Sequence, residues 1–144
     1  PESCFRPVIG DHIIPGPKAK RVVLCSGKVY YDLLEEREKK GIQDVALVRL
    51  EQYYPFPRKQ LLETLMPYKE AQLIWCQEEP MNMGAWTFLD RRLESVLREL
   101  EAKDVRPIYV GRAASAATAT GVLSRHMAEQ QQLVAQAMTL KSFS

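Results

Sequence analysis

Ser26, Gly27 and Lys28 form the stretch whose residue types best suit a ligand site. They follow a short apolar run and precede a helical pattern. Ligands of parallel sheets gather beyond strand ends, and helix N-termini favour anions, so Lys28 could hold a phosphate. The stretch does not match the G-x-x-x-x-G-K-[ST] loop, and the chain contains no G-x-G-x-x-G. On spacing alone, a helix cap with a solvated lysine is the simpler interpretation.

Glu78 and Glu79 are adjacent carboxylates that could act as an acid and a base. Neighbours in an extended segment point in opposite directions, so we do not expect a joint catalytic role. One of them should instead receive a backbone N–H or a basic side chain. The sequence also lacks a G-x-S-x-G motif and a carboxylate cluster with metal spacing. We therefore predict no catalytic residue in this chain.

The histidines and cysteines do not suggest a metal site. His12 lies in a proline-rich segment, and His126 has no second ligand one helical turn later. Cys4, Cys25 and Cys76 are far apart, and the last two lie in apolar runs, where a free thiol acts as a small hydrophobe. These patterns indicate a reducing compartment and no zinc.

The basic residues do not form a strongly charged stripe. The formal net charge is +2, which favours neither nucleic acid nor a membrane surface as a partner. Lys28, Arg58 and Arg112 stand near expected strand ends or helix starts. Together they could form an anion site, whereas separately each is a surface cation.

Apolar runs alternate with helical patterns along the chain. We expect strands at 22–25, 44–50, 71–76 and 107–110. Helices are expected at about 28–40, over Leu61 to Met66 with an end at Pro67, at 84–100 and at 121–138. Residues 77–80 and the Ala/Ser/Thr-rich 113–120 should be loops. The last helix should point these residues inward: Val122, Met127, Leu133, Val134 and Ala137.

This alternation predicts an α/β fold with three layers, a mostly parallel sheet with helices on both faces. The 144 residues suit one domain. Residues 1–20 hold four prolines and two glycines, so we expect a linker or extended arm there, with regular structure and the domain over 21–144. No membrane span or signal peptide is expected, and the start without Met suggests a fragment or processed chain.

Long stretches resemble 2-oxoglutarate dehydrogenase, specifically the C-terminal domain of its thiamine-diphosphate-dependent component. They run in the family's order over essentially the whole chain. The stretches are Phe5 to Ile9, Leu24 to Leu33, Arg49 to Gln52 with Tyr54 to Pro57, Trp75 to Ala85, Tyr109 to Arg112, Ala117 to Gly121, and His126 with Glu129 and Gln130.

The resemblance implies the transketolase C-terminal fold. In that family the full enzyme, a homodimer of the tricarboxylic acid cycle, decarboxylates 2-oxoglutarate on thiamine diphosphate and Mg²⁺. It then succinylates the lipoyl arm of the dihydrolipoyl succinyltransferase component. The cofactor motifs belong to earlier domains, so the resemblance implies an inactive isolated domain that binds no cofactor itself. It also implies a cytoplasmic location in a bacterium and the mitochondrial matrix in a eukaryote.

Two sites follow as hypotheses. The family's allosteric site for AMP or acetyl-CoA would here involve Lys28, Arg49, Gln52 and Arg58. A domain taken from a dimeric enzyme should also leave an interface patch. The residues of that patch would be Met81, Asn82, Met83, Gly84 and Trp86.

Three other identities stay open at this point. A 2-oxoadipate dehydrogenase would carry a similar domain, because substrate is recognised in the earlier domains. The C-terminal domain of the β-subunit of pyruvate-type dehydrogenases is a more distant relative. The fold alone would also permit a free-standing binding or adaptor module.

Overall fold

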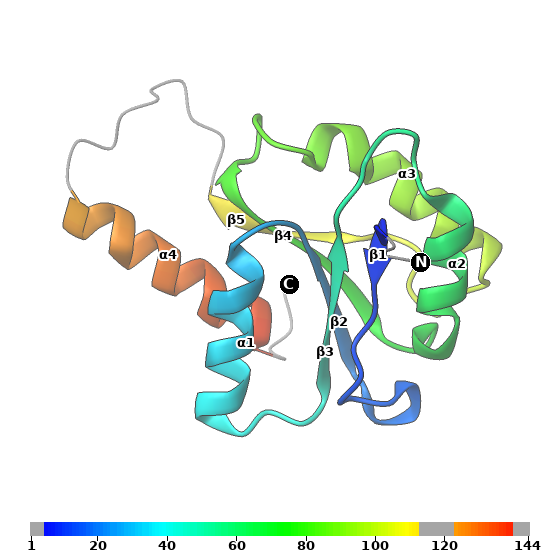
Figure 1. Ribbon diagram of the computed structural model, residues 1–144, viewed down its shortest axis with the longest axis horizontal. Helices are drawn as coiled ribbons and strands as arrows, with labels where there is room; N and C mark the ends of the chain where they lie inside the picture. Colours follow the sequence, from blue (N-terminus) through cyan, green and yellow to red (C-terminus); the bar gives the residue numbers. More distant parts are fainter. Residues whose placement is uncertain (1–4, 113–122, 140–144) are drawn as a thin grey trace.

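The computed structural model describes residues 5–112 and 123–139. Its strands form one sheet in the order β1-β3-β2-β4-β5, in which only the short β1 runs antiparallel to its neighbour (Figure 1). The strands are β1 (Val8–Ile9), β2 (Arg21–Cys25), β3 (Val45–Leu50), β4 (Gln72–Pro80) and β5 (Ile108–Arg112). The α-helices are α1 (Val29–Lys40), α2 (Arg58–Leu65), α3 (Trp86–Glu99) and α4 (Leu123–Met138), and two short 3-10 helices are η1 (Gly16–Lys18) and η2 (Met66–Tyr68).

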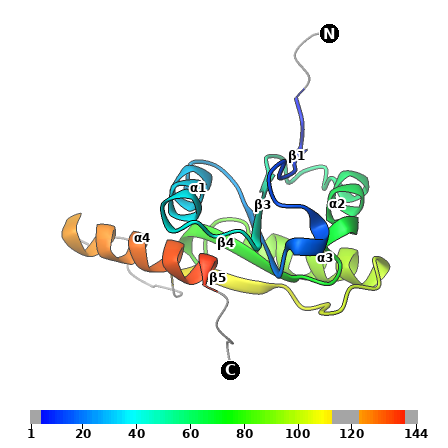
Figure 2. The same ribbon diagram turned by 90° about the horizontal axis from the view of Figure 1, so that it is seen from below.

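The helices cover both faces of this sheet. Figure 2 sets α1 and α4 on one side and α2 and α3 on the other. Alternate residues of β2 point to the two faces of the sheet, because successive side chains of a strand project in opposite directions. Val22 and Leu24 pack with α2 and α3 in one apolar cluster, whereas Val23 and Cys25 pack with α1 and α4 in another. The three-layer, mostly parallel architecture expected from the sequence is thereby confirmed.

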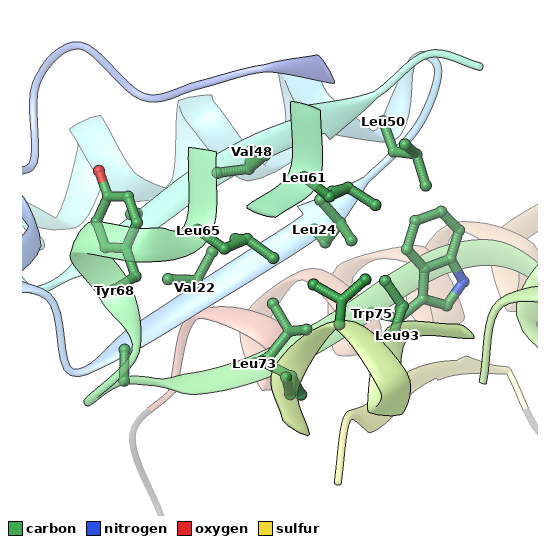
Figure 3. Close-up of a cluster of buried hydrophobic side chains, with 14 of the residues drawn as sticks. Val22, Leu24, Val48, Leu50, Leu61, Leu65, Tyr68, Leu73, Trp75 and Leu93 are labelled. Atoms are coloured by element: carbon green, nitrogen blue, oxygen red, sulfur yellow. The ribbon is translucent and has the colours of Figure 1, made fainter. Parts of the chain in front are cut away.

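The larger cluster fixes the α2–α3 side. Trp75 and Leu24 project from neighbouring strands towards Leu61 of α2 and Leu93 of α3 (Figure 3). All four side chains are almost completely buried. Each such side chain contributes about 1.5–3 kcal/mol when it leaves water, so this layer needs no covalent staple.

The N-terminal segment is part of the folded unit. β1 pairs with β3 through Val8 and Leu50, and Ile14 is buried against the core. The Asp11 carboxylate accepts hydrogen bonds from the Leu47 amide and from Arg37 of α1. The expectation that regular structure begins at Arg21 is therefore wrong. The proline-rich composition gives no sign of this segment, which covers the edge of β3 by pairing as a strand and by binding the Leu47 amide with the Asp11 carboxylate.

The end of β4 also differs from the expectation. Residues 77–80, expected to be a loop, continue the strand to Pro80, which pairs with Arg112 after an irregularity in the ladder. Gly111 permits this approach, because a Cβ there would lie 2.7 Å from the Gln77 carbonyl oxygen. Polar residues and a proline at a strand end gave a loop-like pattern although the backbone stays paired.

Helix α4 packs on the sheet through its C-terminal half. Leu133, Val134 and Ala137 are buried as expected, but Met127 is 53% exposed, so the inward prediction for it is wrong. The N-terminal half of the helix extends beyond the sheet (Figure 1), which leaves its side chains less covered. Val122 and the expected 113–120 loop lie outside the described residues.

Candidate functional site at the carboxyl edge

The carboxyl edge is defined here as the ends of β2, β3 and β4 with the segments 26–31, 51–57 and 81–86. It contains the residues of both predicted sites except Arg58, the first residue of α2. The chain passes from β2 to β3 on one side, and then crosses to β4 on the other side of β2. Such a reversal opens a crevice beyond the strand ends, where α/β proteins bind ligands. Lys28 and Glu78 face each other there, with Nζ 3.7 Å from a carboxylate oxygen.

Lys28 is free to turn towards solvent. Its side chain is 86% exposed, while that of Glu78 is 21% exposed. Lys28 occupies the position just before α1, where no side chain caps the helix. A cation there sits beside backbone N–H groups that favour anions. The expectation that one of the two adjacent glutamates meets a basic partner is confirmed by this pair.

Arg49 lies next to the same helix start. Its Cα is in register with Cys25 at the end of β2, and its Nε is 3.3 Å from Glu51. The guanidinium carbon lies 4.6 Å from the Tyr30 ring centre and 5.8 Å from that of Tyr31. Arg49 thus packs against the Tyr30–Tyr31 pair at the start of α1, and Glu51 neutralises part of its charge.

Gln52 and Arg58 make other contacts. The Gln52 amide donates to the Pro55 carbonyl at 3.0 Å, within its own loop. Arg58 donates to the Glu99 carboxylate and to the Ser95 carbonyl, both on α3. The hypothesis grouped four residues, whereas the contacts pair Lys28 with Glu78 of β4, place Arg49 against α1 and tie Arg58 to α3.

Gln77 builds the turn that carries the second predicted site. Its Oε1 accepts from the Trp75 indole N–H at 2.8 Å and from the Trp86 amide at 3.1 Å. Its Nε2 donates to the carbonyl oxygens of Glu79, Pro80 and Met83 at 3.0, 2.9 and 2.8 Å. A buried amide with all these partners holds the turn in one conformation.

Met81 and Met83 project from that turn. They are 37% and 46% exposed, which is unusual for side chains that bury well. Gly84 has φ +69°, and a Cβ there would lie 3.1 Å from Glu79, so glycine suits the turn sterically. Asn82 is exposed, whereas Trp86 is half-buried with its ring 5.5 Å from Tyr109. The interface prediction itself stays a prediction.

Tyr109 and Arg112 brace the turn from β5. The Tyr109 hydroxyl donates to the Arg112 carbonyl at 2.5 Å, and burial raises the pKa of Tyr109 to about 12. Arg112 reaches the Glu78 carbonyl, Glu129 and Gln130. Arg112 thus joins β4, β5 and α4, and its part in an anion site stays a prediction.

The two cysteines of the apolar runs are buried, as the sequence analysis predicts. Cys25 and Cys76 are buried free thiols, and burial raises the pKa of both, that of Cys76 to about 12. His126 is exposed on α4. No group of three or more His, Cys, Asp or Glu within 5–112 and 123–139 could hold a metal ion. In the same ranges no helix is long and apolar enough to cross a membrane. Cys4 lies outside the described residues.

Sequence reasoning missed Gln77 and Asp11, two polar residues that each hold several backbone groups, at opposite ends of the sheet. Gln77 stands within a stretch that carried the family resemblance, but its type gives no sign that it is buried. Asp11 lies in the proline-rich segment. A polar residue that serves backbone groups leaves no periodic signal, so only the folded contacts reveal it.

Comparison with known proteins gives the family. A family model described as "2-oxoglutarate dehydrogenase C-terminal" matches residues 1–138. The 2-oxoglutarate dehydrogenase E1 components of Brucella anthropi and Brucella melitensis biotype 2 are each 59% identical over 112 residues, which is 78% of this chain. The chain spans 11% of the length of these relatives.

A solved structure supports the fold. The protein described as "Split gene transketolase, inactive beta4 tetramer" aligns with a TM-score of 0.55 at 18% identity. The alignment covers 99% of this chain and 45% of that one. At that identity the likeness concerns architecture alone, and it agrees with the expected transketolase-like layers. From the match along nearly its whole length and the 59% identity to E1 components, the chain belongs to the 2-oxoglutarate dehydrogenase C-terminal family.

Proposed function

We propose that this chain is the C-terminal, non-catalytic part of the E1 component of 2-oxoglutarate dehydrogenase. The observation that carries the proposal is the 59% identity to E1 components over 112 residues. The chain contributes assembly and regulation, and chemistry takes place elsewhere in the polypeptide. Residues 21–144 form the proposed domain, and the segment that leads into it packs against the domain's core through Val8 and Ile14.

The complete enzyme decarboxylates 2-oxoglutarate with thiamine diphosphate and Mg²⁺, as a homodimer. It passes the succinyl group to the lipoyl arm of a dihydrolipoyl succinyltransferase, in the cytoplasm of a bacterium or the mitochondrial matrix of a eukaryote. The relatives' description as E1 components supports this proposal. In this proposal thiamine diphosphate and Mg²⁺ are held by other parts of the polypeptide, and this chain supplies none of their ligands.

Turnover tests the function directly. The full-length polypeptide, given thiamine diphosphate, Mg²⁺ and a lipoyl acceptor, should consume 2-oxoglutarate, and the 144-residue chain alone should not. A parallel assay with 2-oxoadipate separates the two substrate classes. Turnover by the chain alone, or a clear preference for 2-oxoadipate, would overturn this part of the proposal.

The regulatory role is binding of AMP or acetyl-CoA at the carboxyl edge by Lys28, Arg49, Gln52 and Arg58. The exposed Lys28 beside the start of α1 supports a phosphate position there. Arg58 can join only if its contacts with Glu99 and Ser95 open. Lys28 at the start of α1 can therefore bind a phosphate without rearrangement, whereas Arg58 at the start of α2 must first release its contacts with α3.

Calorimetric titration of AMP and acetyl-CoA into the full-length enzyme checks this role. Lys28→Ala should weaken the affinity by about tenfold, or roughly 1.4 kcal/mol, in a salt-sensitive way. The affinity of Arg58→Ala shows whether Arg58 contacts the ligand. Lys59→Ala is the matched control because Lys59 is the exposed neighbour of Arg58. Equal affinity in wild type and Lys28→Ala would remove the phosphate position.

The structural role is an interface formed by Met81, Asn82, Met83, Gly84 and Trp86 with other domains of the enzyme. The exposure of the two methionines supports it. The half-buried Trp86 contributes mainly by fixing the base of the turn through Gln77 and Tyr109.

A further inference from the structure

The two halves of α4 are attached to the domain in different ways. The second half places four apolar side chains in the buried cluster on the α1 side of the sheet, namely Leu133, Val134, Ala137 and Met138. In the first half, which extends beyond the sheet (Figure 1), every side chain from Arg125 to Ala128 is exposed. A groove of about 340 Å³ lies between α4 and α1. Among the described residues, the first half of α4 is therefore held mainly by polar contacts.

Arg112, the last residue of β5, makes several of these contacts. Its Nε lies 3.1 Å from a carboxylate oxygen of Glu129. It also donates to the side-chain oxygen of Gln130 at 3.1 Å and to the His126 carbonyl at 3.3 Å. Gln130 in turn donates to the Asp32 carboxylate of α1 at 2.9 Å. The Arg112 guanidinium thus fastens the first half of α4 to the sheet, and Gln130 fastens it to α1.

A second glutamate contacts the same guanidinium through its main chain, because Arg112 also donates to the Glu78 carbonyl. The Glu78 side chain reaches Lys28 at the start of α1, and Arg112 reaches α4. Both side chains therefore project to the face that α1 and α4 cover (Figure 2). Glu78 and Glu129 thus offer two alternative carboxylates to one cation, which is itself only 12% exposed.

Arg112 cannot pair fully with the Glu78 carboxylate while it holds α4. One guanidinium nitrogen donates to the Glu78 carbonyl, and a second is shared between Gln130 and the His126 carbonyl. Arginine and carboxylate groups commonly pair through two parallel hydrogen bonds, so a full pair with Glu78 would take a donor away from α4. At present the Glu78 carboxylate faces Lys28 instead, with Nζ 3.7 Å from one oxygen. The partner of Glu78 thus decides how many donors Arg112 can offer α4.

We propose that an anion bound at Lys28 shifts Glu78 from Lys28 to Arg112 and so loosens the first half of α4. The inference rests on the proposed function, because it takes the effector phosphate to bind at Lys28. A phosphate there repels the Glu78 carboxylate and takes up its lysine partner. Glu78 then draws the guanidinium away from Glu129 and Gln130, whose hold on the helix weakens. The regulatory site at the start of α1 thereby controls a helix that is attached through the edge strand β5.

The coupling must act in both directions. If the effector loosens α4, a change that loosens α4 must strengthen effector binding by the same factor. Couplings between two binding sites typically lie at about 5–150-fold, and we expect the low end because only one guanidinium changes its partner. Glu129→Gln removes the carboxylate that competes with Glu78. It should therefore raise the affinity for AMP about fivefold, although Glu129 lies outside the proposed effector site.

Hydrogen exchange in the full-length enzyme tests the first direction. With saturating AMP, the backbone amides in the first half of α4 should exchange about fivefold faster, whereas those of the second half, anchored by the buried cluster, should not change. In Glu78→Gln, which lacks the charge that draws Arg112, AMP should bind without speeding this exchange. AMP that binds wild type without faster exchange there would overturn the inference alone. Absence of AMP binding would overturn the regulatory proposal and the inference with it.

Calorimetric titration of AMP into full-length Glu129→Gln tests the reverse direction. The matched control is Glu35→Gln, which removes the same charge from an exposed position of α1 and leaves the contacts of Arg112 in place. A rise in affinity of about fivefold in Glu129→Gln, with little change in Glu35→Gln, supports the coupling. Equal affinities in all three proteins would overturn it, and so would equal rises in both variants, because the net charge alone would then explain them. Turnover of 2-oxoglutarate by the same preparations separates these outcomes from a failure of the catalytic proposal.

Discussion

The amino half of the sheet and its carboxyl edge use charged residues in opposite ways. Where β2 and β3 begin, Arg21 and Arg37 are buried, with Arg21 bonded to Gln72 and to the last carbonyls of α4. At the carboxyl edge Lys28 is 86% exposed beside a loose pair. Removing one partner of a buried charge costs several kcal/mol, whereas surface pairs contribute little. Substitutions in the amino half should therefore report folding, and those at the carboxyl edge should report binding.

The largest expected effect is that of Asp11→Ala in the amino half. It leaves the buried Arg37 without its carboxylate and the Leu47, Ile13 and Ile14 amides without their acceptor. We expect a loss of about 3–5 kcal/mol in the free energy of unfolding, measured by urea denaturation. The exposed Asp104→Ala is the control. Adding Arg37→Met to Asp11→Ala should recover part of the loss, because the uncompensated charge is then gone.

The stability difference between wild type and Asp11→Ala should depend on pH, which provides a second test of the role of Asp11. Burial alone would raise the pKa of Asp11, but hydrogen bonds from Leu47, Arg37, Ile13 and Ile14 outweigh burial, and the pKa is lowered. A lowered folded-state pKa adds stability above the unfolded value, about 3.9, and that stability is lost as pH falls through the folded value. The wild-type advantage over Asp11→Ala should thus shrink below pH of about 4. A constant difference from pH 7 to pH 3 would contradict this assignment.

A smaller effect is expected for Gly111→Ala, beside the carboxyl edge. The new Cβ would lie 2.5 Å from the Tyr109 hydroxyl and 2.7 Å from the Gln77 carbonyl oxygen, so β4 and β5 must separate locally. We expect a loss of about 1–3 kcal/mol in thermal or urea unfolding. Gly10→Ala is the control, since its Cβ would meet Thr64 at an ordinary 3.4 Å. Equal stability of the two variants would mean that the strand ends tolerate separation.

The fold and Lys28 could be predicted from the sequence, whereas the polar residues that hold backbone groups could not. Val22–Cys25 and Leu73–Cys76 are continuous apolar runs, so burial, strand type and layer order follow from pattern. Lys28 was identifiable because its neighbours mark a strand end and a helix start. Asp11 and Gln77 were not, because their partners are backbone groups fixed only by the tertiary fold. Arg58 was grouped with Lys28 because both stand near helix starts and because the family resemblance implies a shared site. Its pairing with Glu99 of α3 depends on how α2 and α3 pack.

The smallest effect on folding should come from Lys28→Ala, and it divides the two regions most clearly. The Lys28–Glu78 pair is 3.7 Å long and water-exposed on the lysine side, so its loss should change the free energy of unfolding by less than about 0.5 kcal/mol. Glu78 keeps access to water in this variant, because its side chain is already 21% exposed. The same variant should measurably lower the affinity of the full-length enzyme for a nucleotide effector. Unfolding and titration of one protein preparation therefore measure both quantities. A destabilisation comparable to that of Asp11→Ala would show that the Lys28–Glu78 pair is needed for folding. The contrast between a folding role in the amino half and a binding role at the carboxyl edge would then fail.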